Sequence, residues 1–112
     1  MRGALAAGAL LASLGACGPG APDLSEARGL ALRPMAGGLA VEGSGGREIG
    51  FGRAQAGALA AMAKVAGRAP RPAACRPGRE AFALGGLRVV FEAERFVGWQ
   101  DASGAAGRGC GA

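Results

Sequence analysis

The three cysteines of this chain, Cys17, Cys75 and Cys110, are the residues with the widest choice of chemistry. A cysteine can act as a nucleophile, bind a metal ion or form a disulfide bond. The chain contains no histidine, so it lacks the imidazole that usually activates a thiol or completes a zinc site. Cys75 and Cys110 also lack a C-x-x-C spacing. They are predicted to form a structural disulfide, with a redox or catalytic pair as the alternative.

Carboxylates are the other groups that could catalyse a reaction, as general acids or bases. They are scattered, and most fall where turns or exposed strand faces are expected: Glu42, Glu48, Glu80, Glu92, Glu94 and Asp101. Two glycine-rich runs, at 43–48 and 50–55, lack the third glycine of a dinucleotide-binding loop. The sequence therefore predicts a protein that is not an enzyme and has no metal site and no cofactor.

The first residues have the pattern of an export signal. Met1 and Arg2 give a positive start, residues 3–14 are uncharged and mostly apolar, and Gly18–Pro22 interrupts any helix. As a helix, the apolar stretch would be about 18 Å long, which is too short for the hydrocarbon core of a bilayer. Residues 1–16 are therefore predicted to be a removable signal peptide.

The end of this segment, Leu14-Gly15-Ala16-Cys17, resembles the lipobox of bacterial lipoproteins. The resemblance implies that Cys17 is acylated and becomes the new N-terminus; a plain signal peptide with a free Cys17 is the alternative. Several acyl chains together hold a protein firmly on a bilayer. Gly18, which is not Asp, implies the periplasmic face of the outer membrane in a Gram-negative cell. Residues 17–37 are predicted to be a flexible tether, and the membrane is the expected partner.

Acylation of Cys17 would leave Cys75 and Cys110 as the remaining pair, and their bond would add about 4 kcal/mol of stability. The net charge of the whole chain is +5. Export removes the usual nucleic acids from reach, so no nucleic-acid partner is expected. The Arg- and Pro-rich segment 68–79 is interpreted as a solvated loop, with contact to anionic lipid or cell-wall polymer as the alternative.

Few large side chains are available to build a core, because 23 residues are glycine and 4% are aromatic. Residues 39–43 and 48–51 alternate in polarity around a glycine-rich tetrad and predict a hairpin. Residues 53–66 predict the one helix, with a small-residue face around Leu59 and Met62 and Gly67 as its stop.

The last predicted element is a hairpin formed by residues 87–92 and 95–100, joined by a two-residue turn. This spacing places Phe91 and Phe96 on the face toward the helix, and Arg88 beside Trp99 on the other face. Arg88 and Trp99 therefore form a possible binding surface, unless the indole is part of the core. The predicted fold class is α+β: residues 38–112 form one domain with an amphipathic helix on a small antiparallel sheet of hairpins.

The lipobox and the late hairpin, reading L-x-V-V-F-x-x-x-R-F-V-G-W, resemble small outer-membrane-assembly lipoproteins of the SmpA/OmlA type. The resemblance implies short helices on an antiparallel sheet and covers residues 48–100 loosely. The sequence predicts a non-catalytic envelope lipoprotein that binds or scaffolds another envelope component, either a protein or a cell-wall polymer. A small periplasmic inhibitor or ligand-binding module is the alternative.

Overall fold

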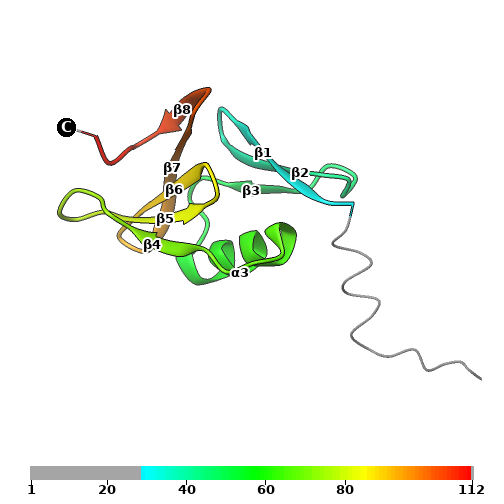
Figure 1. The fold of residues 1–112 in the computed structure, drawn as a ribbon, viewed down its shortest axis with the longest axis horizontal. Coiled ribbons are helices and arrows are strands. Elements are labelled where there is room, and N and C mark those ends of the chain that lie inside the picture. The colour runs from blue at the N-terminus through cyan, green and yellow to red at the C-terminus, as the bar shows by residue number, and fades with distance from the viewer. Residues whose placement is uncertain (1–28, 112) are drawn as a thin grey trace, which may run out of the picture.

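The computed structural model describes residues 29–111 as two antiparallel sheets and one helix, which confirms the predicted α+β class (Figure 1). The strands follow one another in the order β1-β2-β3 in the first sheet and β4-β5-β6-β7-β8 in the second. In chain order the elements are β1 (Ala31–Met35), β2 (Gly38–Glu42), β3 (Glu48–Gly50), α3 (Gln55–Ala66), β4 (Arg71–Ala73), β5 (Glu80–Leu84), β6 (Leu87–Glu92), β7 (Arg95–Asp101) and β8 (Gly104–Gly107).

The folded part begins earlier than the predicted boundary at residue 38. Strand β1 pairs with β2 along its whole length, from Ala31 opposite Glu42 to Met35 opposite Gly38. Residues 31–35 are therefore not part of a flexible tether. Pro34 conceals this strand in the sequence, but an edge strand tolerates proline because one of its sides needs no hydrogen-bond donors. The predicted signal peptide and Cys17 lie outside the described residues.

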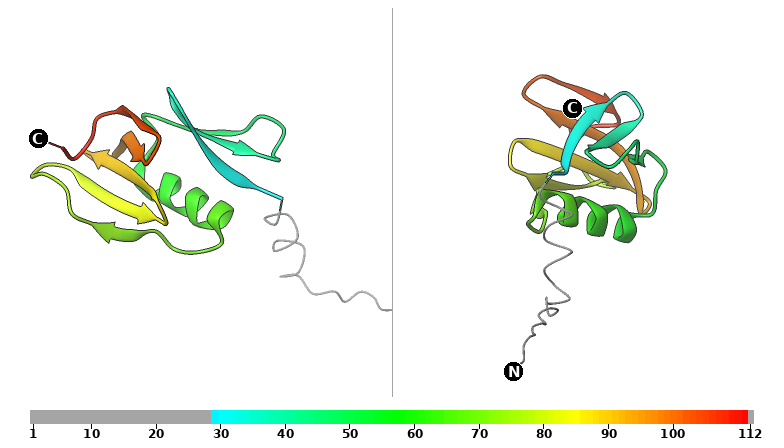
Figure 2. Two further views of the ribbon diagram at one scale, coloured as in Figure 1. Left: turned by 45° about the horizontal axis from the view of Figure 1, so that its top comes forward. Right: turned by 90° about the vertical axis from the view of Figure 1, so that its right-hand side faces the viewer.

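The first predicted hairpin and the predicted helix are both confirmed. Strands β2 and β3 pair antiparallel around the glycine-rich loop 43–47. Helix α3 (Gln55–Ala66) occupies all but the first two residues of the predicted segment 53–66. It ends at Gly67, whose φ of 75° lies in the left-handed region, and the Gly67 N–H donates to the Ala63 carbonyl. Figure 2 shows α3 lying along one side of both sheets.

The β6–β7 hairpin is confirmed, but its predicted register is wrong beyond the first pairs. Phe91 pairs with Phe96 as predicted, and both turn residues have positive φ, as a type I′ turn requires. A bulge then follows, so that Val89 rather than Arg88 lies opposite Trp99. An extra residue in one strand reverses which side chains share a face. Trp99 therefore faces the core.

The core lies between α3 and the inner faces of the two sheets. It contains ten buried residues, namely Leu39, Val41, Ile49, Ala58, Met62, Leu84, Val89, Phe91, Phe96 and Trp99. Four phenylalanine rings follow one another through it, with centroids 5.0 Å apart for Phe51 and Phe96, 5.5 Å for Phe96 and Phe91, and 5.8 Å for Phe91 and Phe82. The prediction that Phe91 and Phe96 lie in the core with the helix is confirmed.

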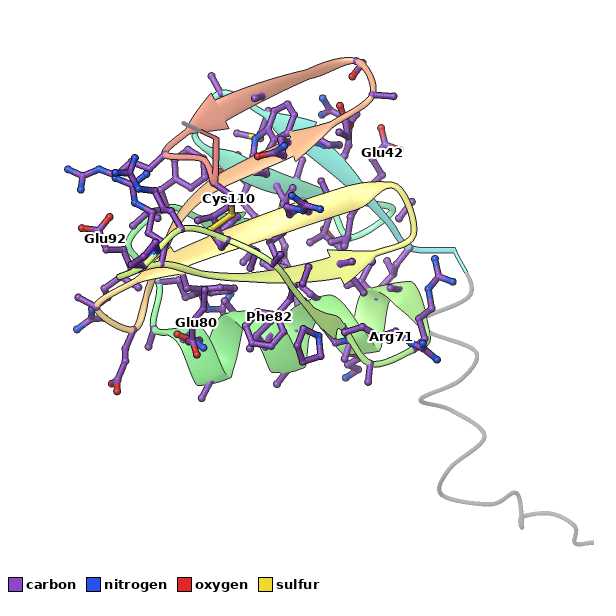
Figure 3. The ribbon with its side chains drawn as sticks, turned by 60° about the vertical axis from the view of Figure 1, so that its left-hand side comes forward. Glu42, Arg71, Glu80, Phe82, Glu92 and Cys110 are labelled. Atoms are coloured by element: carbon purple, nitrogen blue, oxygen red, sulfur yellow. A yellow bond between two sulfur atoms is a disulfide. The ribbon has the colours of Figure 1, made fainter. Side chains whose placement is uncertain are left out.

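The opposite face of the five-stranded sheet is covered by the C-terminal segment. The Arg108 N–H donates to the Val97 carbonyl, and a side chain on Gly98 would overlap the Arg108 backbone. Beneath this segment, Ala81 and Val90 pair across β5 and β6 and are buried. The disulfide between Cys75 and Cys110 fastens the segment to the β4–β5 loop (Figure 3).

Candidate functional site

A groove of about 560 Å³ lies between α3 and the β2–β3 hairpin. Charged and apolar side chains meet there around a hollow of ligand size. The lining residues are Leu30, Val41, Gly43, Ser44, Arg47, Glu48, Ile49, Arg53, Ala61, Lys64 and Val65. We call it the cationic groove.

The apolar surface of the cationic groove comes from both of its walls. Val41 of β2 and Ile49 of β3 are 7% and 1% exposed, because they also belong to the core. On the other side, Ala61 and Val65 are four residues apart in α3 and therefore lie on one face of the helix. The groove is thus an exposed continuation of the core between helix and hairpin.

Arg47 is held in place by its own loop. Its N–H donates to the Ser44 hydroxyl at 3.0 Å, and its carbonyl accepts from the Val41 N–H at 2.9 Å. The Ser44 hydroxyl in turn donates to the Val41 carbonyl. These hydrogen bonds fix the backbone of the glycine-rich loop. The Arg47 side chain therefore extends from a fixed point at the rim, and binding a ligand there does not require the loop backbone to become ordered first.

Arg53 and Lys64 complete the positive rim. The Arg53 carbonyl accepts from the Phe96 N–H at 2.9 Å, which fixes this backbone to β7. The Arg53 Nε atom lies 3.9 Å from the place that a Cβ on Gly57 would take, so its side chain lies back along α3. Lys64 extends from the last turn of the same helix. Arg53 itself precedes α3, which begins at Gln55.

None of these three cations takes part in an ion pair among residues 29–111. The ion pairs in that range join Arg33 to Glu42 at 2.7 Å, Arg79 to Glu92 at 2.8 Å and Arg108 to Glu92 at 3.1 Å. The lining contains one carboxylate, Glu48, against three cations. The groove therefore carries a local excess of positive charge that a bound anion could neutralise.

The structure does not bring the candidate catalytic carboxylates together. Glu42 pairs with Arg33, and Glu80 accepts a hydrogen bond from Gln55 at 2.8 Å over α3 (Figure 3). Asp101 accepts from the Ser103 hydroxyl and from the Ser103 and Gly104 N–H groups, which hold the β7–β8 turn and lower the pKa of its carboxyl. Each of these groups thus has a local structural partner.

Glu92 lies between two arginines at the end of the sheet near the disulfide. The hydrogen bond from Arg79 and then that from Arg108 lower the pKa of its carboxyl below the usual value of 4.5. Arg79 also donates to the Gly109 carbonyl at 2.8 Å. This cluster ties the C-terminal segment to β6. The charges of Arg79, Glu92 and Arg108 therefore pair with one another.

The predicted disulfide is confirmed, since Cys75 and Cys110 are bonded with their Cα atoms 4.7 Å apart. Acylation of Cys17 stays a prediction, because that residue lies outside the described part. Within the same described part, no group of three His, Cys, Asp or Glu side chains is placed to hold a metal ion. No helix within residues 29–111 has the length and apolar character needed to cross a membrane.

Arg88 and Trp99 do not form the binding surface that the predicted register suggested. Trp99 is 7% exposed, and its indole N–H donates to the Met35 carbonyl at 2.7 Å, which joins the two sheets. Arg88 lies opposite Gln100 and is half-buried on the outer face. The bulge separates the two side chains onto opposite faces of the sheet.

Sequence reasoning missed the cationic groove, although one signal pointed to it. Arg53, Gly57 and Lys64 fall on one side of the helical wheel, opposite the small-residue face that packs in the core. Only the pairing of β2 with β3 brings Arg47 across from it.

No protein-family model, curated protein or solved structure matches this chain.

Proposed function

We propose that the protein is a non-catalytic lipoprotein of the cell envelope that binds another envelope component through the cationic groove. In this proposal the acyl chains on Cys17 hold the protein on a membrane, and residues 30–111 form the binding domain. Two observations support the proposal. Residues 14–17 resemble a lipobox, and the cationic groove combines an apolar lining with cations that have no ion pair among residues 29–111.

The observation that carries the proposal is the position of the cationic groove relative to the start of the folded part. Leu30 lines the groove, and the Gly29 backbone lies against Gly43 of the same hairpin. The chain that leads from Cys17 therefore reaches the domain at the groove itself. An anchor at Cys17 would therefore be joined to the domain beside this surface.

Metabolic labelling with a fatty-acid analogue tests the attachment. We expect label on the wild-type protein and none on the Cys17→Ser variant, with both proteins exported. Equal labelling of the two would rule out the lipid site at Cys17.

Crosslinking in intact cells tests the binding role. Wild-type protein should give crosslinked products that an Arg47→Glu/Lys64→Glu variant loses, while an Arg76→Glu/Arg95→Glu variant keeps them. Arg76 and Arg95 are exposed, lie outside the groove and match the change in charge. Products that survive the groove variant would contradict binding through this surface, and specific loss of one hydrolase's activity in solution would favour the inhibitor alternative.

A further inference from the structure

We propose that the cationic groove binds one anionic glycerophospholipid, with the phosphate at the rim and part of an acyl chain along the apolar floor. This deepens the proposed function by naming the ligand class. The lipid proposal rests on the proposed function in one respect only: attachment to a membrane through Cys17 is what would bring lipid near the groove. The binding itself follows from the charge, shape and position of the groove.

The charge of the rim favours a phosphate. Guanidinium groups form paired hydrogen bonds to phosphate oxygens, and an ammonium group adds a compact positive charge. The Arg47 backbone is fixed at both its N–H and its carbonyl, and Lys64 stands on the opposite wall. A phosphate bound between the two walls would contact cations from each. With no competing ion pair within residues 29–111, these cations need not break a bond to bind it.

The floor of the groove favours an acyl chain over a purely polar anion. The apolar lining comes mainly from the partly buried Leu30, Ala61 and Val65, with the buried Val41 and Ile49 behind them. The lining holds no aromatic side chain on which a nucleotide base could stack. Its volume of about 560 Å³ is within the range of small-molecule sites, and α3 contributes Ala61, Lys64 and Val65 to its wall, a stretch about 6 Å long. An amphiphile with a single anionic head matches this division into rim and floor.

The place of the groove brings it within reach of such a lipid. Fully extended, the chain from Cys17 to Gly29 spans at most about 43 Å. The folded part begins beside the groove, so an anchor at Cys17 would keep the rim close to the headgroups of that membrane. A second copy of the chain is a poorer occupant, because the chain without residues 1–16 has 12 basic and 8 acidic residues, a net charge of +4 that makes two copies repel each other.

Vesicle co-sedimentation tests the lipid with the full mature chain carrying Cys17→Ser, so that the acyl anchor does not mask binding. We expect binding to vesicles of phosphatidylcholine with about one phosphatidylglycerol in three, and none to phosphatidylcholine alone. Arg47→Glu/Lys64→Glu should weaken binding about tenfold or more, whereas the matched Arg76→Glu/Arg95→Glu variant should change it less than about threefold. Equal weakening by the two pairs would overturn the proposal in favour of general electrostatic attraction.

A short-chain lipid tests the floor separately from the charge. Soluble dihexanoyl-phosphatidylglycerol should shift the backbone NMR signals of β3 and of the Ala61–Val65 turn, and inorganic phosphate at equal concentration should shift them much less. Ala61→Phe narrows the groove without changing its charge and should abolish the lipid-induced shifts. Its fold is checked by the emission of Trp99, the single tryptophan.

Two results of the NMR experiment, and one measurement of the oligomeric state, would overturn the proposal. Phosphate shifts as large as those of the lipid would mean a bare anion site, and unaltered lipid shifts in a folded Ala61→Phe protein would place the lipid elsewhere. A dimer whose interface covers the groove would mean that a second copy is the occupant. All of these are distinct from failure of the fatty-acid labelling of Cys17, which concerns the attachment alone.

Discussion

Phe91 and Phe96 are the largest fully buried side chains, at 1% and 0% exposure. Their rings link those of Phe51 and Phe82, so that the four phenylalanines of the chain form one continuous cluster. Truncation of either ring would leave a ring-sized space inside this cluster. The cost of a cavity is therefore high here.

Truncation of either ring should destabilise the domain severely. We expect Phe91→Ala or Phe96→Ala to lower the free energy of unfolding by about 3–5 kcal/mol, which is comparable with the total stability of a small domain. Chemical denaturation followed by Trp99 emission measures this. The control Arg71→Ala, at an exposed position, should change the value by no more than about 0.5 kcal/mol. Wild-type midpoints for both phenylalanine variants would contradict the core assignment.

Glu92 should make stability depend on pH in acid. The hydrogen bonds from Arg79 and Arg108 lower the pKa of its carboxyl in the folded protein below the usual value of 4.5. A lowered pKa stabilises the fold above the unfolded-state value, and this contribution is lost as the pH falls through the folded-state value. The stability difference between wild type and Glu92→Gln should therefore be largest near neutral pH and shrink below about pH 4.5.

Denaturant midpoints of the two proteins across that pH range measure the difference. Glu94→Gln is the matched control, because Glu94 is an exposed turn residue with no ion pair among the described residues. A difference between wild type and Glu92→Gln that stays constant down to the acid limit would contradict the role of the ionised carboxylate.

At the scale of elements, the sequence predicted those whose side chains alternate or repeat clearly. The β2–β3 hairpin, helix α3 and the β6–β7 hairpin were predictable because apolar residues occur in them with periods of two or about four. Strands β4 and β8, with the sequences Arg-Pro-Ala and Gly-Ala-Ala-Gly, carry no such pattern. They are strands because the neighbouring strands β5 and β7 supply the backbone partners.

The binding surfaces were less predictable than the elements, for two physical reasons. A single bulge in β7 reverses the direction of Trp99, and its local sign is Gly98, since an isolated glycine inside a strand often marks a bulge. The cationic groove needs the β2–β3 loop and α3 side by side, which depends on tertiary packing rather than on spacing in the chain. The Cys75–Cys110 bond, in contrast, followed from the number of cysteines, because assigning Cys17 to the lipid leaves these two as a pair.

The close contact of β7 with the C-terminal segment makes Gly98 irreplaceable. A methyl group there would overlap the Arg108 carbonyl, so Gly98→Ala should displace this segment and lower the denaturation midpoint. Hydrogen exchange should also show loss of protection at the Arg108 amide. Gly104→Ala is the matched control, because a Cβ there meets no atom within 4 Å. Equal midpoints for the two variants would contradict the close contact.

For the whole molecule, the Cys75–Cys110 bond joins segments 35 residues apart in sequence. A closed loop of this length restricts the unfolded chain and stabilises the folded one by about 4 kcal/mol. Reduction, or the Cys75→Ser/Cys110→Ser variant, should lower the free energy of unfolding by about that amount. Denaturation with and without reductant measures it, and a reductant effect that persists in the double variant would show that the bond is not its source.

If the chain is exported as proposed, the same bond would give it two stabilities, one before and one after it leaves the cytoplasm. Thiols stay reduced in the cytosol, so a newly made chain with the proposed export signal would lack the fastening of its C-terminal segment. The bond cannot form until both cysteines have been made, and Cys110 follows Cys75 by 35 residues. A precursor without this stabilisation of about 4 kcal/mol would unfold more readily for passage through a secretion channel. Oxidation after export would then restore the stability of the folded domain.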